Sequence, residues 1–404
     1  MKVIASGFSG RALSETAAQA GCNISCIDFF GDLDLKKFCR KNFSIKHDSA
    51  EKNYSTQILL DLIENNYDDE QYFVYSSDWD NKPELLNKVL TGKDIKLLGN
   101  SAETLQKVKL KRGSITDKQD LFSFLKRKKF SLPKIIKSEE ELKKEKKIDS
   151  NRKYLLKPYL SGGGKNIKLY PDLSTAQKEI EKEMWNNFYL QQYIEGKVSS
   201  ALFAADEKNA EILGVTEQLK DLTKDSFKYG GNILIKPDLE IISHLKKMAS
   251  ELTENFGLKG INGIDFILSS DGIYFIELNP RFTAAVELLL PIFGAELFEL
   301  YFYDRIDQNL SEKYISSEMP LYAKIIYYAK SDLTVKREIT ELLDYKSVNM
   351  NGKYEFRDLP HPGEEIEKHD PVSTVLVSSG SRQKLFEMCR KAFAFLEEFA
   401  LEEV

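Results

Sequence analysis

Four polar side chains of one predicted β-hairpin could bind a metal ion and the phosphate that the ion holds. Two apolar runs flank an Asp-Gly pair, which supplies the positive φ angles of a short hairpin loop. Asp265 and Glu277 each lie six positions from Asp271, so pairing of the two strands brings these acids together. With Asn279 they form an oxygen-ligand set of the kind that Mg²⁺ takes, and Arg281 beside them could clamp a phosphate. Taken singly, each residue could instead be a charged rim residue of an ordinary hairpin.

A glycine-rich loop follows a second predicted strand, 154–158. Adjacent glycines have no side chains to pack, and ordering them costs more backbone entropy than ordering other residues. The N–H groups of such a loop can fold over phosphates, and Lys157 four residues before the loop strengthens this interpretation. A plain hairpin linker is the alternative. The loop residues are Ser161, Gly162, Gly163, Gly164, Lys165 and Asn166.

A third segment could recognise a base. A predicted strand begins at Tyr189 and ends at Gly196, where a hinge could expose backbone N–H and C=O groups to an adenine edge. The candidate contacts are Gln191, Gln192, Tyr193 and Ile194, and a place in the hydrophobic core is the alternative for the last two.

The N-terminal region reads as a βαβ unit, which implies a right-handed crossover and a parallel sheet. The predicted strands cover 2–8 and 23–30, with a helix between them that ends near Ala20. Gly7-x-x-Gly10 lacks the three-glycine fingerprint, so nicotinamide binding is disfavoured. We expect a tight turn that lets a ligand approach the helix N-terminus.

Polar residues also follow a predicted strand at 72–75. Because ligands gather outside the carboxyl ends of strands in open α/β sheets, Ser9, Ser77 and Asp78 are candidates for binding a substrate's polar groups. Each could equally be a capping or turn residue.

Other segments complete the expected framework. A helix is predicted over 237–257 with Gly257 ending it, and the charge-rich run 138–153 is expected to be a solvated helix anchored by Leu142. The apolar stretch 282–303 is expected to be helical and broken at Pro291.

The composition is typical of a globular protein with two or three domains. The 404 residues are 42% hydrophobic and 30% charged, and the net charge of −5 argues against nucleic acid as a main partner. No apolar window long enough for a membrane span occurs, so no membrane association and a cytoplasmic location are expected. The four cysteines show no paired metal spacing, and the four histidines are scattered, so no metal site of these residues is expected.

Taken in order, the motifs resemble the ATP-grasp superfamily. They are Asp117-Lys118, Lys157 before the glycine loop, the segment 191–196, and Asp265 with the run 277–281. The resemblance implies a multidomain α/β and α+β fold. A Rossmann-like parallel sheet would cover 1–115, and the ATP-grasp domain 116–315, with a small subdomain at 116–190 and a large one at 191–315. Residues 316–404 are similar to the C-terminal β-rich subdomain of biotin-carboxylase-like members.

The resemblance also implies roles for individual residues. Lys118 and Lys157 look like the nucleotide-phosphate lysines, Ser161–Asn166 like the flap, and Gln191–Ile194 like the adenine hinge. Asp265, Glu277 and Asn279 look like ligands of two Mg²⁺ ions, with Mn²⁺ as an alternative, and Arg281 looks like the residue that faces the transferred phosphoryl group. Val198 stands where many members carry a ribose-binding glutamate, so either Glu195 or another residue takes that role, or the ribose is held differently.

The activity implied is ATP-dependent joining of a carboxylate to an amine through an acyl phosphate, with release of ADP and phosphate. The runs 75–79 and 97–100 look like a carboxylate–amine ligase subgroup, some of whose relatives act in coenzyme biosynthesis. Two alternatives stay open: biotin-carboxylase-like carboxylation and nucleotide binding without catalysis. No biotin-accepting Met-Lys-Met run is present. The expected partners are small-molecule carboxylate and amine substrates, and a homodimer is left open.

Overall fold

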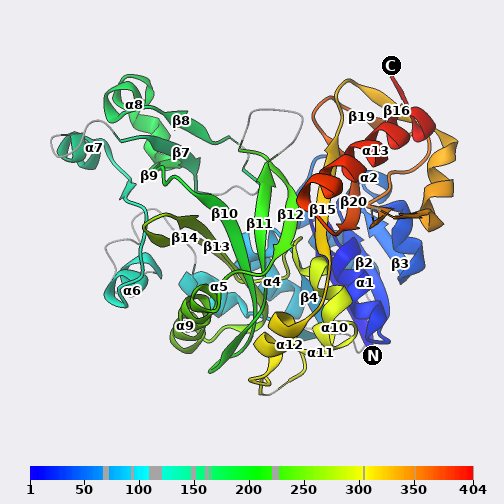
Figure 1. Cartoon of the computed structure of the whole chain (residues 1–404), viewed down its shortest axis with the longest axis horizontal. Helices are drawn as coiled ribbons and strands as arrows, with labels where there is room; N and C mark the ends of the chain where they lie inside the picture. Colours follow the sequence, from blue (N-terminus) through cyan, green and yellow to red (C-terminus); the bar gives the residue numbers. More distant parts are fainter. Residues whose placement is uncertain are drawn as a thin grey trace.

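The chain folds around four β-sheets, and the fold class expected from the sequence is confirmed (Figure 1). The computed structural model describes residues 1–66, 72–91, 95–108, 121–146, 152–159, 163–164, 166–220, 227–303, 305–350 and 352–403. In Figure 1 a small four-stranded sheet projects at one end, while the N-terminal sheet and the last long helix lie at the other.

The N-terminal sheet is parallel and has the strand order β3-β2-β1-β4-β5. Helix α1 connects β1 to β2, as the βαβ prediction requires. The strands are β1 (Lys2–Gly7), β2 (Asn23–Asp28), β3 (Cys39–Ser44), β4 (Tyr72–Tyr75) and β5 (Lys96–Leu98). The helices are α1 (Arg11–Gln19), α2 (Ile45–Asp48), α3 (Thr56–Asn66), α4 (Pro83–Leu90) and α5 (Ala102–Val108), with 3-10 turns η1 (Leu33–Lys37) and η2 (Trp79–Asn81).

The small sheet has the order β6-β9-β7-β8 and carries its own hydrophobic core. Leu142 on α7 is buried in that core, which confirms its predicted role as the anchor of the charged helix. The elements are α6 (Leu121–Arg127), β6 (Ile135–Ile136), α7 (Glu139–Lys146), β7 (Tyr154–Pro158), β8 (Lys168–Tyr170), α8 (Leu173–Glu179), η4 (Lys182–Asn186) and β9 (Phe188–Gln192).

The central sheet has nine strands in the order β14-β13-β10-β11-β12-β15-β20-β18-β17. It runs across the predicted boundary at 315, so strands from the last ninety residues extend the sheet that carries the candidate metal residues. The division there stays a prediction. The first strands and helices are β10 (Lys197–Asp206), β11 (Ala210–Lys220), β12 (Tyr229–Ile235), α9 (Leu239–Phe256), β13 (Lys259–Ser269) and β14 (Gly272–Asn279). The C-terminal ones are α12 (Leu310–Ser316), β15 (Leu321–Tyr328), β16 (Leu333–Val335), η6 (Arg337–Asp344), β17 (Lys346–Asn349), β18 (Gly352–Arg357), β19 (Glu365–Ile366), β20 (Pro371–Ser379), α13 (Arg382–Ala400) and β21 (Leu401–Glu403).

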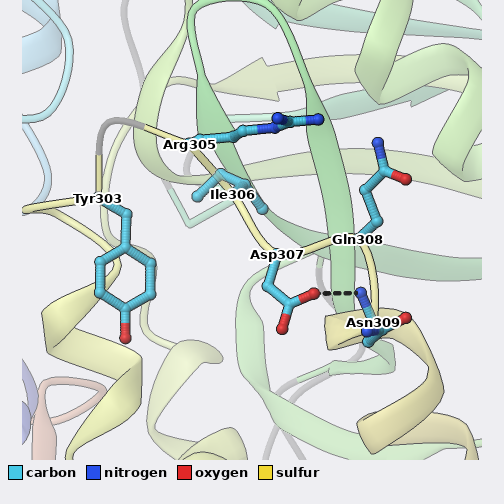
Figure 2. A pocket seen from close by; sticks show the side chains of 6 residues that line it. All are labelled: Tyr303, Arg305, Ile306, Asp307, Gln308 and Asn309. Atoms are coloured by element: carbon cyan, nitrogen blue, oxygen red, sulfur yellow. Dashed lines mark hydrogen bonds between the residues drawn. The ribbon is translucent and has the colours of Figure 1, made fainter.

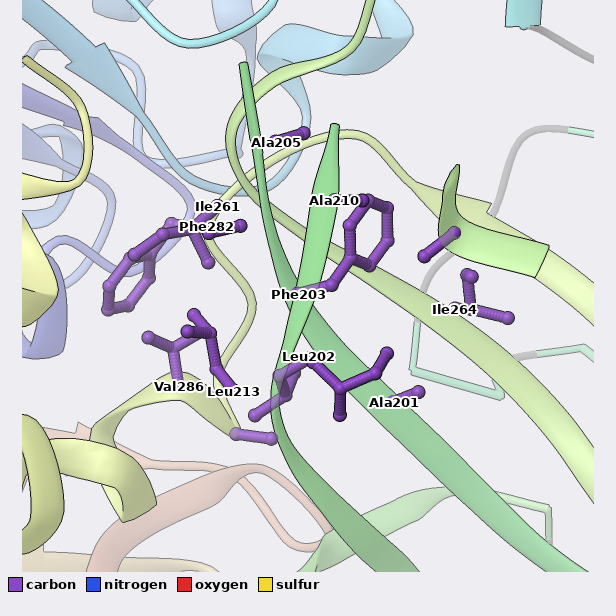
Figure 3. Packing of buried hydrophobic residues seen from close by; sticks show 14 of the residues in the cluster. Ala201, Leu202, Phe203, Ala205, Ala210, Leu213, Ile261, Ile264, Phe282 and Val286 are labelled. Carbon is purple, nitrogen blue, oxygen red and sulfur yellow. The ribbon is translucent and has the colours of Figure 1, made fainter. Parts of the chain in front are cut away.

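Strands β10 and β11 form the centre of the largest core. Both are buried along most of their length, because apolar elements cover the sheet and keep solvent away from it. Figure 3 shows Leu202, Leu213 and Val286 among the side chains that meet there. Helix α9 contacts β10 and β11 and ends at Gly257 with a left-handed φ of 66°, as the sequence predicted.

The apolar stretch 282–303 is helical only in three short segments, and the predicted break at Pro291 is wrong. Pro291 lies in the first turn of α10 (Leu290–Phe293), where its missing N–H has no helical partner to lose. The break falls at Gly294, whose positive φ of 56° ends α10 before α11 (Glu296–Glu299). The turn η5 (Val286–Leu289) precedes both.

A buried ionic cluster joins α1 of the N-terminal region to η5 and to the C-terminal part of the central sheet. The Arg11 side chain is fully buried and lies 2.9 Å from Glu15, 2.7 Å from Glu287 and 2.8 Å from Asp358. Lys324 on β15 pairs with Glu287 as well. Burial alone would lower the pKa of Arg11, but Asp358 and Glu287 outweigh burial and raise it, so the guanidinium stays charged.

Replacing Arg11 by alanine is expected to destabilise the protein by about 3–5 kcal/mol, because Glu287 and Asp358 would lose their partner in a buried site. Urea unfolding followed by circular dichroism measures this difference. Lys330→Ala is the control, since Lys330 pairs with Glu397 on the surface and its loss should cost about 1 kcal/mol or less. Equal midpoints for the two variants would contradict the prediction.

Within the described part of the chain, no helix is both long and apolar enough to cross a lipid bilayer.

Candidate active site

The hairpin of β13 and β14 brings Asp265 and Glu277 opposite each other, as predicted. The pairing depends on a β-bulge. Phe266 pairs with Phe275, so Asp265 would pair with Ile276 in a regular ladder. The extra residue at Ile276 shifts the register and places Glu277 beside Asp265 instead.

A continuous line of hydrogen bonds fixes the side chains at this end of the sheet. Gln218 Nε2 donates to Ser200 Oγ (2.8 Å), and Ser200 Oγ donates to Asp265 Oδ1 (2.7 Å). Asn279 Nδ2 donates to Asp265 Oδ2 (3.1 Å), and Arg281 Nη2 donates to Asn279 Oδ1 (3.1 Å). Asp265, Asn279 and Arg281 therefore form one preorganised group.

The N-terminal sheet holds the other side of Arg281. Asp80 Oδ1 lies 3.0 Å from Arg281 Nε and also accepts a hydrogen bond from the backbone N of Asp78 (3.0 Å). Burial would lower the pKa of Arg281, but Asp80 and then Glu277 outweigh it and raise the pKa. Arg281 thus carries its positive charge between the N-terminal sheet and the hairpin.

Asn100, which follows β5, fixes the backbone next to Arg281. Its Nδ2 donates to Asn262 Oδ1 (2.7 Å) and to the carbonyl of Pro280 (3.0 Å), and its Oδ1 accepts from Lys259 N (2.8 Å). Asn100 is buried, so these bonds are shielded from water.

Lys157 on β7 of the small sheet and Glu277 on β14 of the central sheet interact electrostatically. Solvent reaches the Glu277 side chain, yet the surrounding protein raises the pKa of its carboxyl to about 7, although Lys157 acts in the opposite direction. Lys157 Nζ also donates to Gln191 Oε1 (3.3 Å) on the neighbouring strand.

The carboxyl and amide oxygens of this site fit a hard cation. Loss of hydration beside the surrounding protein raises the pKa of both Asp265 and Glu277, and a bound cation would favour their charged forms. Asn279 Oδ1 accepts one hydrogen bond and keeps a second lone pair. Groups of three or more His, Cys, Asp or Glu side chains suited to a metal are absent from the described residues, so the set consists of two acids and one amide.

In the absence of metal, the free energy of unfolding is expected to fall as pH rises from about 4.5 to about 7. The folded state then keeps a proton on Glu277 that the unfolded state has lost. Thermal unfolding in a chelator should show a flatter pH profile for Glu277→Gln. Glu195→Gln, a change at an exposed position, should keep the wild-type slope. Identical slopes for both variants would contradict the pKa shift.

Gly163 and Gly164 of the glycine loop lie against the start of β12. Gly163 O accepts a hydrogen bond from Tyr229 N (3.0 Å), and a Cβ on Gly164 would lie 1.9 Å from the Phe227 carbonyl oxygen. The expectation that packing does not explain these glycines is therefore wrong for Gly164, because its backbone approaches another segment closely. Ser161, Gly162 and Lys165 lie outside the described residues, as does Lys118.

The predicted adenine hinge is partly engaged in the sheet. Gln192 N donates to Lys134 O (2.8 Å) and Tyr193 N donates to Lys153 O (2.9 Å), which leaves Ile194 N as the amide for a base edge. Gln191 is buried and faces Lys157. The adenine role stays a prediction.

We expected the turn after β1 to leave the N-terminus of α1 open to a ligand, but this prediction is wrong. Asp28 Oδ2 accepts a hydrogen bond from Gly10 N (2.8 Å), and a Cβ on Gly10 would lie 2.4 Å from Cys26 Sγ. The carboxyl of Asp28 thus fills the position that an anionic ligand would take. Of the predicted substrate residues, Ser9 uses its carbonyl to accept from Ser76 Oγ (2.8 Å).

Ser77 lies close to β1, and Asp78 lies close to Arg281. The Ser77 carbonyl accepts a hydrogen bond from Phe8 N (3.2 Å). Asp78 is joined to Arg281 through Asp80. Asp80, Asn100, Ser200 and Gln218 were missed as site residues, although Asn100 ends one of the two runs that the subgroup resemblance singled out and Asp80 directly follows the other.

A surface hollow lies away from this site. Figure 2 shows its lining residues, among them Arg305, Asp307 and Asn309, with Asp307 Oδ1 accepting from Asn309 N (2.9 Å). Ile306 N donates to Asp206 at the end of β10, which is six residues, or about 20 Å, from Ser200. The hollow therefore takes no part in the chemistry of the hairpin.

Comparison with known proteins agrees with this geometry. The profile of the ATP-grasp domain matches residues 115–285. The chain contains an ATP-grasp domain. The resemblance seen in the sequence motifs is thereby confirmed, and the residues described above lie in or against this domain.

The proteins similar in sequence differ in the identity and in the share of the chain that they cover. An uncharacterized protein of Methanocaldococcus jannaschii is 23% identical over 398 residues, covering 96% of this chain and 92% of that protein. Tyramine–L-glutamate ligase of the same organism is 30% identical over 148 residues, which are 35% of this chain and 46% of that enzyme.

Solved structures show the same fold over the whole chain. The biotin carboxylase domain of Hydrogenobacter thermophilus 2-oxoglutarate carboxylase, a dimer in complex with MgADP, ADP and bicarbonate, has a TM-score of 0.71 at 15% identity. The alignment covers 99% of this chain and 91% of that one. L-amino acid ligase from Bacillus licheniformis has a TM-score of 0.64 at 12% identity, covering 100% and 98%.

Proposed function

We propose that the protein is an ATP-dependent ligase that joins a carboxylate to an amine through an acyl phosphate. The observation that carries the proposal is the group of Asp265, Asn279 and Arg281, linked side chain to side chain, with Glu277 and Lys157 beside it. The ATP-grasp domain and the ligases among the similar proteins support it.

The residues divide the work of phosphoryl transfer. Asp265, Glu277 and Asn279 would hold two Mg²⁺ ions, with Mn²⁺ as an alternative, and such ions neutralise charge on the phosphates of ATP. Lys157, together with Lys118, would bind those phosphates. The segment 191–194 would hold adenine, and the glycine loop 161–166 would cover the phosphates and exclude water.

The reaction proceeds in two displacements. An oxygen of the substrate carboxylate bonds to the γ-phosphorus of ATP, and the bond to ADP breaks. The nitrogen of the neutral amine then bonds to the acyl carbon, inorganic phosphate leaves, and the amine loses a proton. Arg281 stabilises the negative charge of the transferred phosphoryl group, because Asp80 and Asn279 hold its guanidinium in place.

An ADP-release screen tests the proposal. Amino acids, other carboxylates and amines are supplied in pairs with Mg-ATP, and release should require both members of a pair. The fold likeness to a biotin carboxylase makes carboxylation the second candidate. A strict bicarbonate requirement with a biotin acceptor would replace the ligase by that activity. ATP binding without ADP release in any pair would favour a non-catalytic nucleotide-binding protein.

A homodimer is part of the proposal, because the similar biotin carboxylase domain is a dimer. Light scattering of the purified protein tests it, and a monomer mass at micromolar concentration would contradict it. The cytoplasmic location stays a prediction of the sequence.

A further inference from the structure

Four half-buried aromatic side chains gather at the carboxyl ends of β1 and β2. The ring of Phe8 stacks on Phe29 with centroids 5.3 Å apart and meets Phe30 at 5.1 Å and Tyr54 at 5.0 Å, both edge-on. The carboxyl ends of parallel strands are where open α/β sheets bind ligands, and aromatic side chains commonly line such sites.

This aromatic group, Phe8, Phe29, Phe30 and Tyr54, is linked to Arg281 through hydrogen bonds and a salt bridge of the segment 77–80. Phe8 N donates to the carbonyl of Ser77 (3.2 Å), the residue before Asp78. Asp78 N donates to Asp80 Oδ1 (3.0 Å), and the same oxygen lies 3.0 Å from Arg281 Nε. The segment 77–80 therefore links the ring-bearing Phe8 to Arg281, the residue proposed to face the phosphoryl group.

The carboxyl group of Asp78 interacts electrostatically with Tyr54 of the aromatic group and with Arg281. Among the residues that the structure describes, Asp78 forms no salt bridge, and its Oδ1 accepts a hydrogen bond from Asn81 Nδ2 (3.2 Å). Burial and then the charge of Asp78 raise the pKa of the Tyr54 hydroxyl, which shows that the two side chains are neighbours. The backbone of Asp78 has a φ of 82°, a left-handed conformation that few residues other than glycine adopt.

The other charges near the rings are already paired. Lys46 Nζ lies 5.8 Å from the ring centroid of Phe29 and 5.2 Å from that of Phe30, but it forms an ion pair with Glu364. Asp78 acts on Arg281 electrostatically but forms no salt bridge within the described residues, and so this edge favours a cationic ligand over an anionic one.

We propose that the aromatic group binds the ring of an aromatic amine and that Asp78 binds its ammonium group. The inference rests on the proposed function, since it names the class of the amine substrate. A planar ring would pack edge-on or offset against Phe8 and Phe30, as aromatic rings prefer. Its amine would then lie on the side of Arg281, where the acyl phosphate forms.

Calorimetric titration of the full-length protein with phenethylamine, without nucleotide, tests the proposal. Phenethylamine should bind about tenfold or more tightly than hexylamine, which has a similar length but no ring, and than 3-phenylpropionate, which has the ring but an acid. Phe30→Ala and Asp78→Asn should each weaken phenethylamine binding by about tenfold or more. Asn adopts the left-handed conformation readily, so this variant keeps the backbone.

Two further variants make the result specific. Phe399→Ala on α13 removes a half-buried, stacked ring far along the chain and should leave phenethylamine binding unchanged. Phe8→Leu keeps apolar bulk without the ring and should also weaken binding. It tests the contribution of the rings with a smaller change in core volume than Phe30→Ala. No binding of phenethylamine, equal binding of hexylamine, or tighter binding of 3-phenylpropionate would each overturn the proposal. Binding of phenethylamine without ADP release in any pair would sink the ligase function and leave the aromatic site standing.

Discussion

Glu277→Gln is expected to abolish measurable ADP release. Glutamine keeps the size of the side chain and one oxygen but loses the charge that a cation beside Asp265 would need. Loss of one preorganised charge partner commonly costs about 10²–10³ in rate, and loss of a metal ligand affects every later step as well. A coupled assay of ADP release at saturating Mg-ATP measures the effect, with circular dichroism to show an intact fold.

Glu254→Gln is the matched control for this variant. Glu254 lies on α9 and is exposed. Its change should leave turnover within about twofold of wild type, because exposed charges contribute little. Near-normal ADP release by Glu277→Gln would remove Glu277 from the metal site and with it the main support for the ligase.

Arg281→Ala is expected to reduce turnover by about 10²–10³ or more while ATP still binds. The guanidinium bridges Asp80 in the turn η2 and Asn279 on the hairpin, so its loss removes a positive charge and frees the side chain of a proposed metal ligand. Arg281→Lys should recover only part of the activity, because an ammonium cannot reach two partners with a rigid fork. Steady-state kinetics should show the loss in kcat, with KM for ATP little changed.

The exposed Arg390 on α13 provides the control for charge removal. Arg390→Ala should keep wild-type kcat. A loss that appears in KM for ATP alone, with kcat preserved, would place Arg281 in nucleotide binding instead of phosphoryl transfer.

The hairpin could be predicted from sequence because its signals are local. Alternating apolar residues and a turn pair place Asp265 near Glu277 whatever the rest of the chain does. The bulge at Ile276 could not be read from that pattern, although the symmetric spacing about Asp271 led to the right pair. The end of α9 was also predictable from a local signal, because the conformational freedom of Gly257 alone sets it.

The supporting residues could not be predicted, because they act across distant segments. Asp80 and Asn100 reach Arg281 and Pro280 only after the N-terminal sheet packs on the hairpin. Gly164 gave a signal that was interpreted as freedom for phosphate binding, whereas its closest neighbour is the backbone of Phe227. Asp28 likewise occupies a helix N-terminus that the glycine spacing alone suggested was open.

The buried cluster around Arg11 limits how specificity in this protein can be exchanged. The N-terminal sheet region, which carries the aromatic rings and Asp78, is joined through Arg11 to Glu287, just after the ATP-grasp match, and to Asp358 after β18. Grafting the first hundred residues of a relative onto this chain would bring a new substrate pocket but also a new neighbour for those two acids. A working chimera must therefore match both acids and Lys324 together with the graft, so the three regions are inherited as one unit.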